Sequence, residues 1–224
     1  MAGHVLDNPV WHALSTQHAG LALTADGAAR YPAAIVPFAA VGVPSPRAAD
    51  QLTSLIDDDE SLFVVGVTPQ PPPGWKLEPK KPVLQMVCNA RTTVVDGPPV
   101  SVMTAENVPD MIGLTDLVFP GFFRARTLDM GRYYGIYHGS LLAAMGGERM
   151  RLDGYQELSA VCTHPDYAGR GYAHRLLGIL CSRAFDQGFT PFLHVYADNT
   201  RAIGVYRRMS FADRTVLPFW ALHQ

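Results

Sequence analysis

The chain has 224 residues, of which 48% are hydrophobic and 17% charged, and its formal net charge is −2. These values are typical of a folded globular protein with one large or two small domains, and they exclude a largely disordered chain. No run of Lys or Arg stands out, so a nucleic acid is not expected as a partner. No apolar run reaches the roughly 20 residues that span a bilayer, and no signal segment opens the chain, so we expect a cytoplasmic protein without a membrane partner.

The first half of the chain predicts a few small elements. A helix is expected near Pro46–Ile56 and strands over Ser61–Val67 and Val83–Cys88. The proline-rich stretch Thr68–Pro82 predicts a loop or extended excursion between those strands, because proline supplies no N–H to a sheet. A second short Pro/Gly segment, Asp96 to Pro99, marks a predicted domain boundary. We therefore expect an N-terminal accessory α/β domain over residues 1–99 and a second domain over residues 100–224.

The second half shows clearer periodicity. Apolar residues at helical spacing predict a helix over Val108–Phe119, and a Gly139-Ser140 turn separates two predicted paired strands, Tyr133–His138 and Leu141–Leu152. The remaining predicted elements are a strand at Glu157–Thr163, a strongly amphipathic helix at Tyr172–Phe185, a strand at Pro191–Val195, a helix from about Asn199 to Met209, and strands at Phe211–Thr215 and Leu217–Leu222.

Glycines stand between the strand that ends at Thr163 and the helix that starts at Tyr172. Gly169-Arg170-Gly171-Tyr172-Ala173 would let the backbone approach a ligand closely, with the free N–H groups and dipole of the helix directed at an anion such as phosphate. A plain tight turn is the alternative. A dinucleotide fingerprint would need glycine where His174 stands, and no Gly-Lys-Ser/Thr of a P-loop follows, so those two readings are excluded.

Two motifs in this order resemble the GNAT superfamily of acyltransferases. The first is Val161-Cys162-Thr163-His164-Pro165-x-x-x-Gly169-Arg170-Gly171-x-Ala173, which is similar to the acyl-CoA signature. The second is Asn199-x-x-Ala202-x-x-x-Tyr206-x-x-x-x-Phe211. The resemblance extends over roughly residues 104–215 and is closest to the glycine N-acyltransferase-like branch, whose members carry an additional N-terminal domain.

The resemblance implies a set of residues that bind acetyl-CoA or another acyl-CoA as co-substrate. The amides of Gly169 to Ala173 would hold the pyrophosphate, and the backbone of Val161 and Thr163 would bind the pantetheine arm. The Val161 amide could also polarise the thioester carbonyl. Asn199 would hydrogen-bond the pantetheine, although a helix N-cap role is equally compatible with its position. The full expected binding set is Val161, Cys162, Thr163, Ala168, Gly169, Arg170, Gly171, Tyr172, Ala173, Asn199 and Ala202.

Two residues are predicted to be catalytic. Tyr206 is the candidate acid for the leaving thiolate, and its alternative is a tyrosine packed on the apolar face of its helix. Glu157 is the candidate base that removes a proton from the acceptor ammonium, and strand alternation would place it on the same face as Ser159 and Val161. Its alternative is a solvated carboxylate at the start of a strand.

The sequence also departs from the family pattern at two positions. Ala168 stands where the family usually has Gln or Arg, and Ser210 stands where glycine usually precedes the final Phe211. The first change removes a polar side chain and leaves the backbone amides, so coenzyme binding is expected to persist. No metal is expected, because Cys88, Cys162 and Cys181 form no C-x-x-C pair; reduced thiols are expected instead.

The resemblance thus implies an α/β (α+β) GNAT fold with a central mixed, mostly antiparallel sheet, splayed where the coenzyme enters and flanked by helices. A degenerate copy of the same fold is one option for the smaller N-terminal domain. The implied activity is direct N-acetyl transfer to a small amine or amino acid, and a homodimer is left open. The alternatives are a non-catalytic acyl-CoA-binding regulatory module and a structural protein whose partner binds the N-terminal half.

Overall fold

The computed structural model describes residues 3–57 and 60–224. The N-terminal half contains α1 (Pro9–Ser15), α2 (Pro46–Thr53) and short 3-10 turns. Its strands are β1 (Leu23–Ala25), β2 (Ala28–Arg30), β3 (Ala39–Val41), β4 (Leu62–Val65) and β5 (Lys76–Pro79), followed by β6 (Val83–Cys88). The helix predicted near residues 46–56 begins at Pro46, where the Ser45 hydroxyl accepts a hydrogen bond from the Ala48 amide.

The second half alternates strands and helices largely where the sequence predicts them. Its helices are α3 (Val108–Val118), α4 (Tyr172–Asp186) and α5 (Thr200–Arg208). Its strands are β7 (Ser101–Val102), β8 (Tyr133–His138), β9 (Leu141–Leu152), β10 (Tyr155–Thr163), β11 (Thr190–Tyr196), β12 (Phe211–Leu217) and β13 (Phe219–His223). The apolar stripe of α4 is buried through Leu176, Leu177 and Leu180, as its 3.6-residue period requires.

A seven-stranded sheet forms the centre of the molecule, in the order β12-β6-β11-β10-β9-β8-β7. Its only parallel neighbours among the described strands are β10 and β11, and every other pair is antiparallel. The expected mixed, mostly antiparallel sheet flanked by helices is therefore confirmed. Two three-stranded sheets, β1-β2-β3 and β4-β13-β5, form the smaller N-terminal part.

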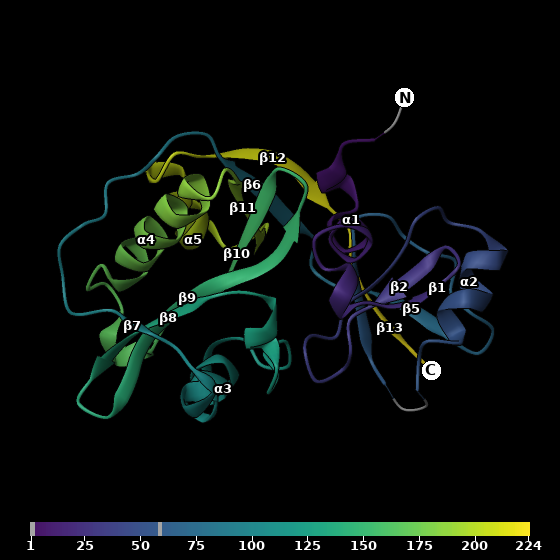
Figure 1. The fold of residues 1–224 in the computed structure, drawn as a ribbon, viewed down its shortest axis with the longest axis horizontal. Coiled ribbons are helices and arrows are strands. Elements are labelled where there is room, and N and C mark those ends of the chain that lie inside the picture. The colour runs from purple at the N-terminus through teal and green to yellow at the C-terminus, as the bar shows by residue number, and fades with distance from the viewer. Residues whose placement is uncertain (1–2, 58–59) are drawn as a thin grey trace.

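Strands cross between the two parts in both directions. β6 comes from the N-terminal half but lies between β11 and β12 of the central sheet, and C-terminal β13 lies between β4 and β5 (Figure 1). The proline-rich stretch predicted as a loop or extended excursion thus contains β5, an edge strand that pairs with β13 and ends at Pro79. The division at residue 99 stays a prediction, and this exchange of strands argues against two independent folding units.

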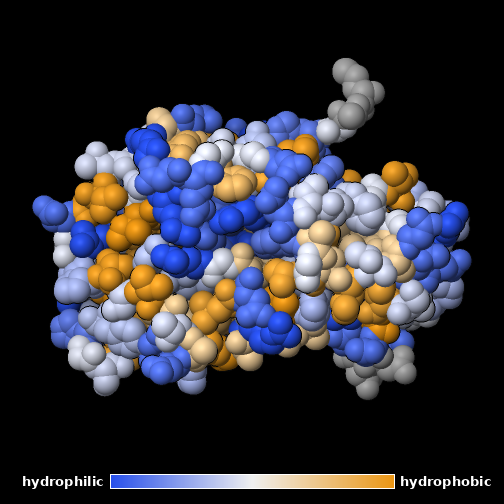
Figure 2. Space-filling view, viewed as in Figure 1, coloured by the Kyte–Doolittle hydropathy of each residue, from blue (hydrophilic) through white to orange (hydrophobic). Residues whose placement is uncertain are grey.

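The surface away from this junction carries scattered exposed apolar side chains. Val102 of β7, Leu117 and Val118 of α3, and Leu141 at the start of β9 are each at least 42% exposed. Hydrophobic residues gather in the part of Figure 2 where β7 and β8 lie. No helix among the described residues is long and apolar enough to cross a bilayer.

Candidate active site

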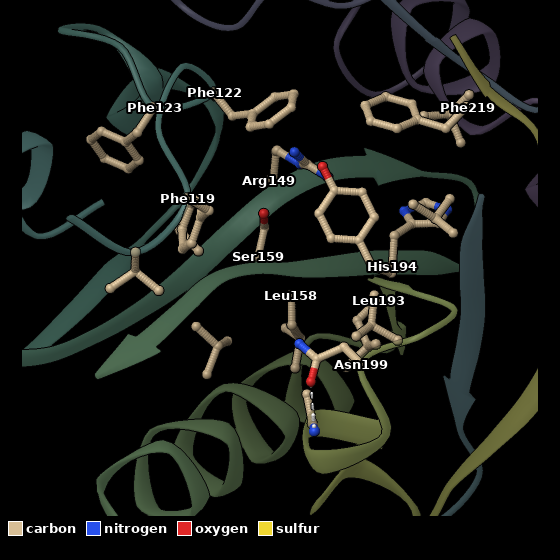
Figure 3. Close-up of a pocket in the computed structure, with 18 of the residues that line it drawn as sticks. Phe119, Phe122, Phe123, Arg149, Leu158, Ser159, Leu193, His194, Asn199 and Phe219 are labelled. Carbon is tan, nitrogen blue, oxygen red and sulfur yellow. Dashed lines mark hydrogen bonds between the residues drawn. The ribbon is translucent and has the colours of Figure 1, made fainter. Parts of the chain in front are cut away.

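The parallel pair β10 and β11 separates part-way along its length. The register runs from Tyr155 opposite Thr190 to Glu157 opposite Phe192, and no further pairs join the two strands. A cavity of about 340 Å³ lies where they part (Figure 3). One wall is backbone and side chains of Leu158 to Val161, and the opposite wall is Leu193 to Tyr196 of β11. The splay expected from the sequence is therefore present.

The backbone of β10 is irregular at the cavity. Its pairing with β9 shifts register between Ser159 and Cys162, and Ala160 has a φ of 52°, in the left-handed region. Consequently Ser159, Ala160 and Val161 all line the cavity, whereas a regular strand would present only alternate residues. Of the three residues predicted to share one face, Ser159 and Val161 line the cavity and Glu157 does not.

Glu157 is wholly buried beneath the cavity floor, in an ion pair with Arg149. Arg149 donates from Nε to Glu157 Oε2 at 2.7 Å and from Nη2 to Oε1 at 2.6 Å. Burial alone would raise the pKa of the Glu157 carboxyl, but the charge of Arg149 and hydrogen bonds from Arg149 and His194 lower it to about 2. A carboxylate in this state holds a proton poorly, so it is a weak base.

His194 connects Glu157 to a longer polar chain across the sheet. Its Nδ1 lies 2.8 Å from Glu157 Oε1, and its Nε2 lies 3.0 Å from Nε2 of Gln85 on β6. Gln85 Oε1 accepts from Arg214 of β12, which also pairs with Asp7 near the N-terminus. Because Gln85 donates its amide N–H, the His194 Nε2 accepts and Nδ1 carries the hydrogen.

Tyr206 of α5 lines the cavity, with its ring 5.9 Å from that of Phe211. Burial raises the pKa of Tyr206 to about 12, with a smaller contribution from nearby Cys162. The phenol therefore stays protonated at neutral pH and can donate a hydrogen bond. Tyr206 therefore lines the cavity and also packs on Phe211, and its role as the acid stays a prediction.

Asn199 and Ala202 also line the cavity, at the start of α5. Asn199 is the N-cap: its Oδ1 accepts from the Ala202 amide at 3.1 Å, as the dashed line in Figure 3 shows. Because the cap uses only the oxygen, the side-chain Nδ2 remains able to donate to a ligand.

The predicted anion site lies at the N-terminus of α4, outside the cavity lining. Gly169 and Gly171 have φ of 81° and 79°, and a Cβ built on either would meet no atom within 4 Å. Gly171 is the N-cap residue of α4, and no side chain caps its first turn. The amides from Tyr172 onward therefore lack the side-chain partners that most helix N-termini have. Arg170 lies over the Tyr167 ring at 4.7 Å.

The other predicted binding residues have more local roles. Cys162 is buried in a cluster with Met103 and Met145, and burial raises the pKa of its thiol to about 12, so it is an inert thiol. Thr163 pairs with Ala144 of β9, and Ala168 ends the short 3-10 turn before the glycines. Among the described residues, no group of three or more His, Cys, Asp or Glu side chains is placed to hold a metal.

The sequence did not predict that Arg149 and His194 lie at the cavity floor. Both line the cavity, as do Ser159 and the loop residues Phe119, Phe122 and Phe123 after α3 (Figure 3). Arg149 belongs to no local motif, because it lies within strand β9 and reaches the cavity only through the register of the sheet. Period-2 alternation of Gly147, Arg149 and Arg151 along β9 was the available signal.

Comparisons with known proteins agree with this architecture. A sequence profile of the FR47-like protein family matches residues 133–219. A proposed acetyltransferase of the GNAT family from Novosphingobium aromaticivorans superimposes with a TM-score of 0.90 and 34% identity, over 99% of both chains. The chain belongs to the GNAT family. Two GNAT structures share the fold at lower identity: one from Kribbella flavida (TM-score 0.59, 17% identity, 95% of both chains) and one from Colwellia psychrerythraea (0.53, 15%, 73% of this chain and 65% of that one).

A search of curated protein sequences gave no match. Membership of the GNAT family thus rests on a relative that spans nearly the whole chain, N-terminal part included. The shared length shows that the strand exchange through β6 and β13 belongs to a fold common to both proteins, and it confirms the fold class predicted from the sequence.

Proposed function

We propose that this GNAT protein transfers an acetyl or other acyl group from acyl-CoA to the amine of a small molecule or amino acid. The observation that carries the proposal is the parting of β10 and β11 after Glu157 and Phe192, which opens a cavity against unpaired strand backbone. Family membership and the resemblance to the glycine N-acyltransferase-like branch support the same reaction.

Coenzyme A would lie along the open edge of β10. Its pyrophosphate would be held by the uncapped amides of α4 behind Gly169 and Gly171, where open space surrounds both glycines. The pantetheine would then run past Val161 and Thr163 to Asn199, whose Nδ2 can donate to an amide oxygen. Ala168 removes one side chain from this path and leaves its backbone unchanged.

In the reaction, a neutral amine attacks the thioester carbon and forms a C–N bond. The carbonyl oxygen becomes an oxyanion that the Val161 amide stabilises. As the oxyanion collapses, the C–S bond breaks and the nitrogen releases its extra proton to solvent. Tyr206 would donate a hydrogen bond to the departing sulfur; its raised pKa keeps that donor protonated. The parent thiol has a pKa of about 8.5, so the thiolate leaves without a full proton transfer from the phenol.

Glu157 is better suited to positioning than to the base role predicted for it. Direct proton transfer would require the carboxylate to leave Arg149 and reach the cavity, which it does not line. We therefore propose that Glu157 holds Arg149 and His194 in place at the cavity floor. The amine would lose its proton to solvent before binding, because both ring nitrogens of His194 are already used in hydrogen bonds to Glu157 and Gln85.

The experiment is a thiol-release assay with acetyl-CoA and a panel of amines. Tyr206→Phe should lower kcat by at least about tenfold while the melting temperature holds within a few degrees. Tyr155→Phe, on β10 and outside the cavity, is the matched control and should keep the parent rate. Thiol release that Tyr206→Phe leaves untouched would overturn the role of this residue.

One observation favours a second candidate, a non-catalytic acyl-CoA-binding module. The described cavity lining contains no Asp or Glu, and the predicted base is locked in an ion pair. Such a module would show a rise in melting temperature with CoA and no thiol release with any amine. Turnover with any amine excludes it.

A further inference from the structure

Three polar groups on adjacent strands have no hydrogen-bond partner among the described residues. They are the hydroxyl of Tyr133 on β8, the Nη1 of Arg149 on β9 and the hydroxyl of Ser159 on β10, and each residue lines the cavity. The Tyr133 hydroxyl is fully buried with no hydrogen-bond partner among the described residues. Buried hydroxyls are almost always paired, so an unpaired one beside a cavity points to a missing ligand group.

A glycine directs the Tyr133 ring toward the other two groups. Gly147 of β9 pairs with Tyr133 on one side and with Ser159 on the other. A Cβ at Gly147 would lie 2.2 Å from Tyr133 Cδ1, so only glycine lets the ring cross β9 toward β10. The ring is fixed by an edge-to-face contact with Phe123, with centroids 5.4 Å apart.

Arg149 presents its remaining N–H groups on the same side of the sheet. Two residues beyond Gly147 on β9, it uses Nε and Nη2 for Glu157, and its guanidinium lies over the Phe38 ring at 4.8 Å. These contacts fix the guanidinium and leave Nη1 free to donate. Figure 3 shows the Ser159 hydroxyl directed to the side of the sheet where the Arg149 guanidinium lies.

The cavity lining offers no counter-charge to a cationic ligand group, because its described residues include no Asp or Glu. Arg149 is the one side chain of that lining with a permanent charge, and Glu157 balances it, so Arg149 offers a ligand its remaining N–H donors rather than a net charge. The rest of the wall is largely apolar, with Phe38, Phe119, Phe122, Phe123 and Phe219. An acceptor that fits has an apolar body and an anionic group, whereas polyamines and other multiply charged cations find no counter-charge.

We propose that Tyr133, Arg149 and Ser159 form the subsite that binds a carboxylate of the acyl acceptor, whose apolar body lies against the phenylalanines. The inference rests on the proposed acyl transfer and narrows its acceptor. Ser159 lies two residues before Val161, so the two Cα atoms are at most about 7 Å apart. A carboxylate at the subsite therefore keeps an amine attached one or two carbons away close to the thioester that Val161 would bind.

The test compares acceptors that differ in one group. Phenylalanine, its carboxamide and phenethylamine share an amine and a ring, and only the first has a carboxylate. With acetyl-CoA, the expected kcat/KM for phenylalanine exceeds that for each of the other two by at least tenfold, and spermidine is not acetylated. Equal rates for the acid and the carboxamide would overturn the subsite while leaving acyl transfer established.

Tyr133→Phe removes only the unpaired hydroxyl. We expect it to raise the KM for phenylalanine about tenfold, to leave the KM for acetyl-CoA and for phenethylamine unchanged, and not to lower the melting temperature. Tyr137→Phe is the matched control on the same strand, because the Tyr137 hydroxyl bonds to Asp110 and Asn107 outside the cavity. A similar change of KM for all acceptors in Tyr133→Phe would contradict the assignment.

A binding experiment keeps the inference testable if no acceptor is turned over. Calorimetry with N-acetylphenylalanine and its carboxamide measures recognition of the product without chemistry. Tighter binding of the acid by at least tenfold, lost in Tyr133→Phe and kept in Tyr137→Phe, would support the subsite even if acyl transfer failed. Equal binding of acid and carboxamide, or binding of neither, would overturn it.

Discussion

Replacing Glu157 with Gln tests the ion pair under the cavity. The substitution keeps the shape of the side chain and removes the charge that balances Arg149, whose side chain is only 14% exposed. Removing one partner of a buried pair typically costs about 3–5 kcal/mol, because the other charge stays buried without compensation. The pKa gives a similar figure: a fall from 4.5 to about 2 corresponds to about 3 kcal/mol, at about 1.36 kcal/mol per pKa unit.

The free energy of unfolding should fall at acidic pH. Because the folded pKa of Glu157 is lower than the unfolded value, the ionised carboxylate stabilises the fold above pH 4.5, and this contribution is lost as the pH falls toward 2. Roughly 2 kcal/mol of it should disappear between pH 5.5 and pH 3. Glu157→Gln should lack this part of the pH dependence.

Urea unfolding measured at pH 7, 5.5, 4 and 3 separates the two effects. The variant should be about 3 kcal/mol less stable than the parent at pH 7, and the difference should narrow as the pH falls. Arg149→Met combined with Glu157→Gln removes both charges and should recover much of the loss. If Glu157→Gln stays within about 0.5 kcal/mol of the parent at every pH, the account of a buried ion pair is wrong.

Four further predictions concern other parts of the molecule. Burial lowers the pKa of His18 to about 4, so the fold should lose about 3 kcal/mol as the pH falls from 6.5 through 4, and urea unfolding of His18→Gln should lack this loss. Ser210 has a φ of 64°, so Ser210→Gly should raise the free energy of unfolding by about 0.5–1 kcal/mol, and a decrease would refute the strain. Asn199→Ala should cost about 1 kcal/mol in the same assay and weaken CoA binding, whereas Asn199→Ser should restore the stability alone. A fragment of residues 100–224 should lack the far-UV and near-UV circular dichroism of a folded sheet, because β6 is missing between β11 and β12; a cooperative melt would show otherwise.

Local patterns were enough to predict most helices and strands. The stripe of α4, the cap at Asn199 and the turn at Gly139 each depend on residues within a few positions of one another, so periodicity and turn chemistry identify them. The structure also explains why the family usually has glycine at position 210: Ser210 has a left-handed backbone conformation, which glycine adopts without strain. The sequence did not predict strand β5, because its pairing with β13 joins residues more than 140 positions apart.

The site was predicted unevenly for the same reason. The glycine turn and Tyr206 lie in contiguous motifs, and their positions follow from chain order. The environment of Glu157 does not: its state depends on Arg149 from β9 and His194 from β11, which meet it only through sheet register. The left-handed backbone at Ala160 then determines which side chains of β10 reach the cavity. Strict alternation along a strand does not predict this irregularity.

The strand exchange gives the N-terminal part a role in the site. β6 supplies Gln85, which accepts from Arg214 and donates to His194, so the polar chain under the cavity runs from Arg149 to Asp7 near the N-terminus. Phe38 and Phe219, which line the cavity, also come from the smaller part. The state of Glu157 therefore depends on residues on both sides of position 99. We expect the same of acceptor choice, so that changes in the N-terminal part should alter selectivity without changing the coenzyme motif.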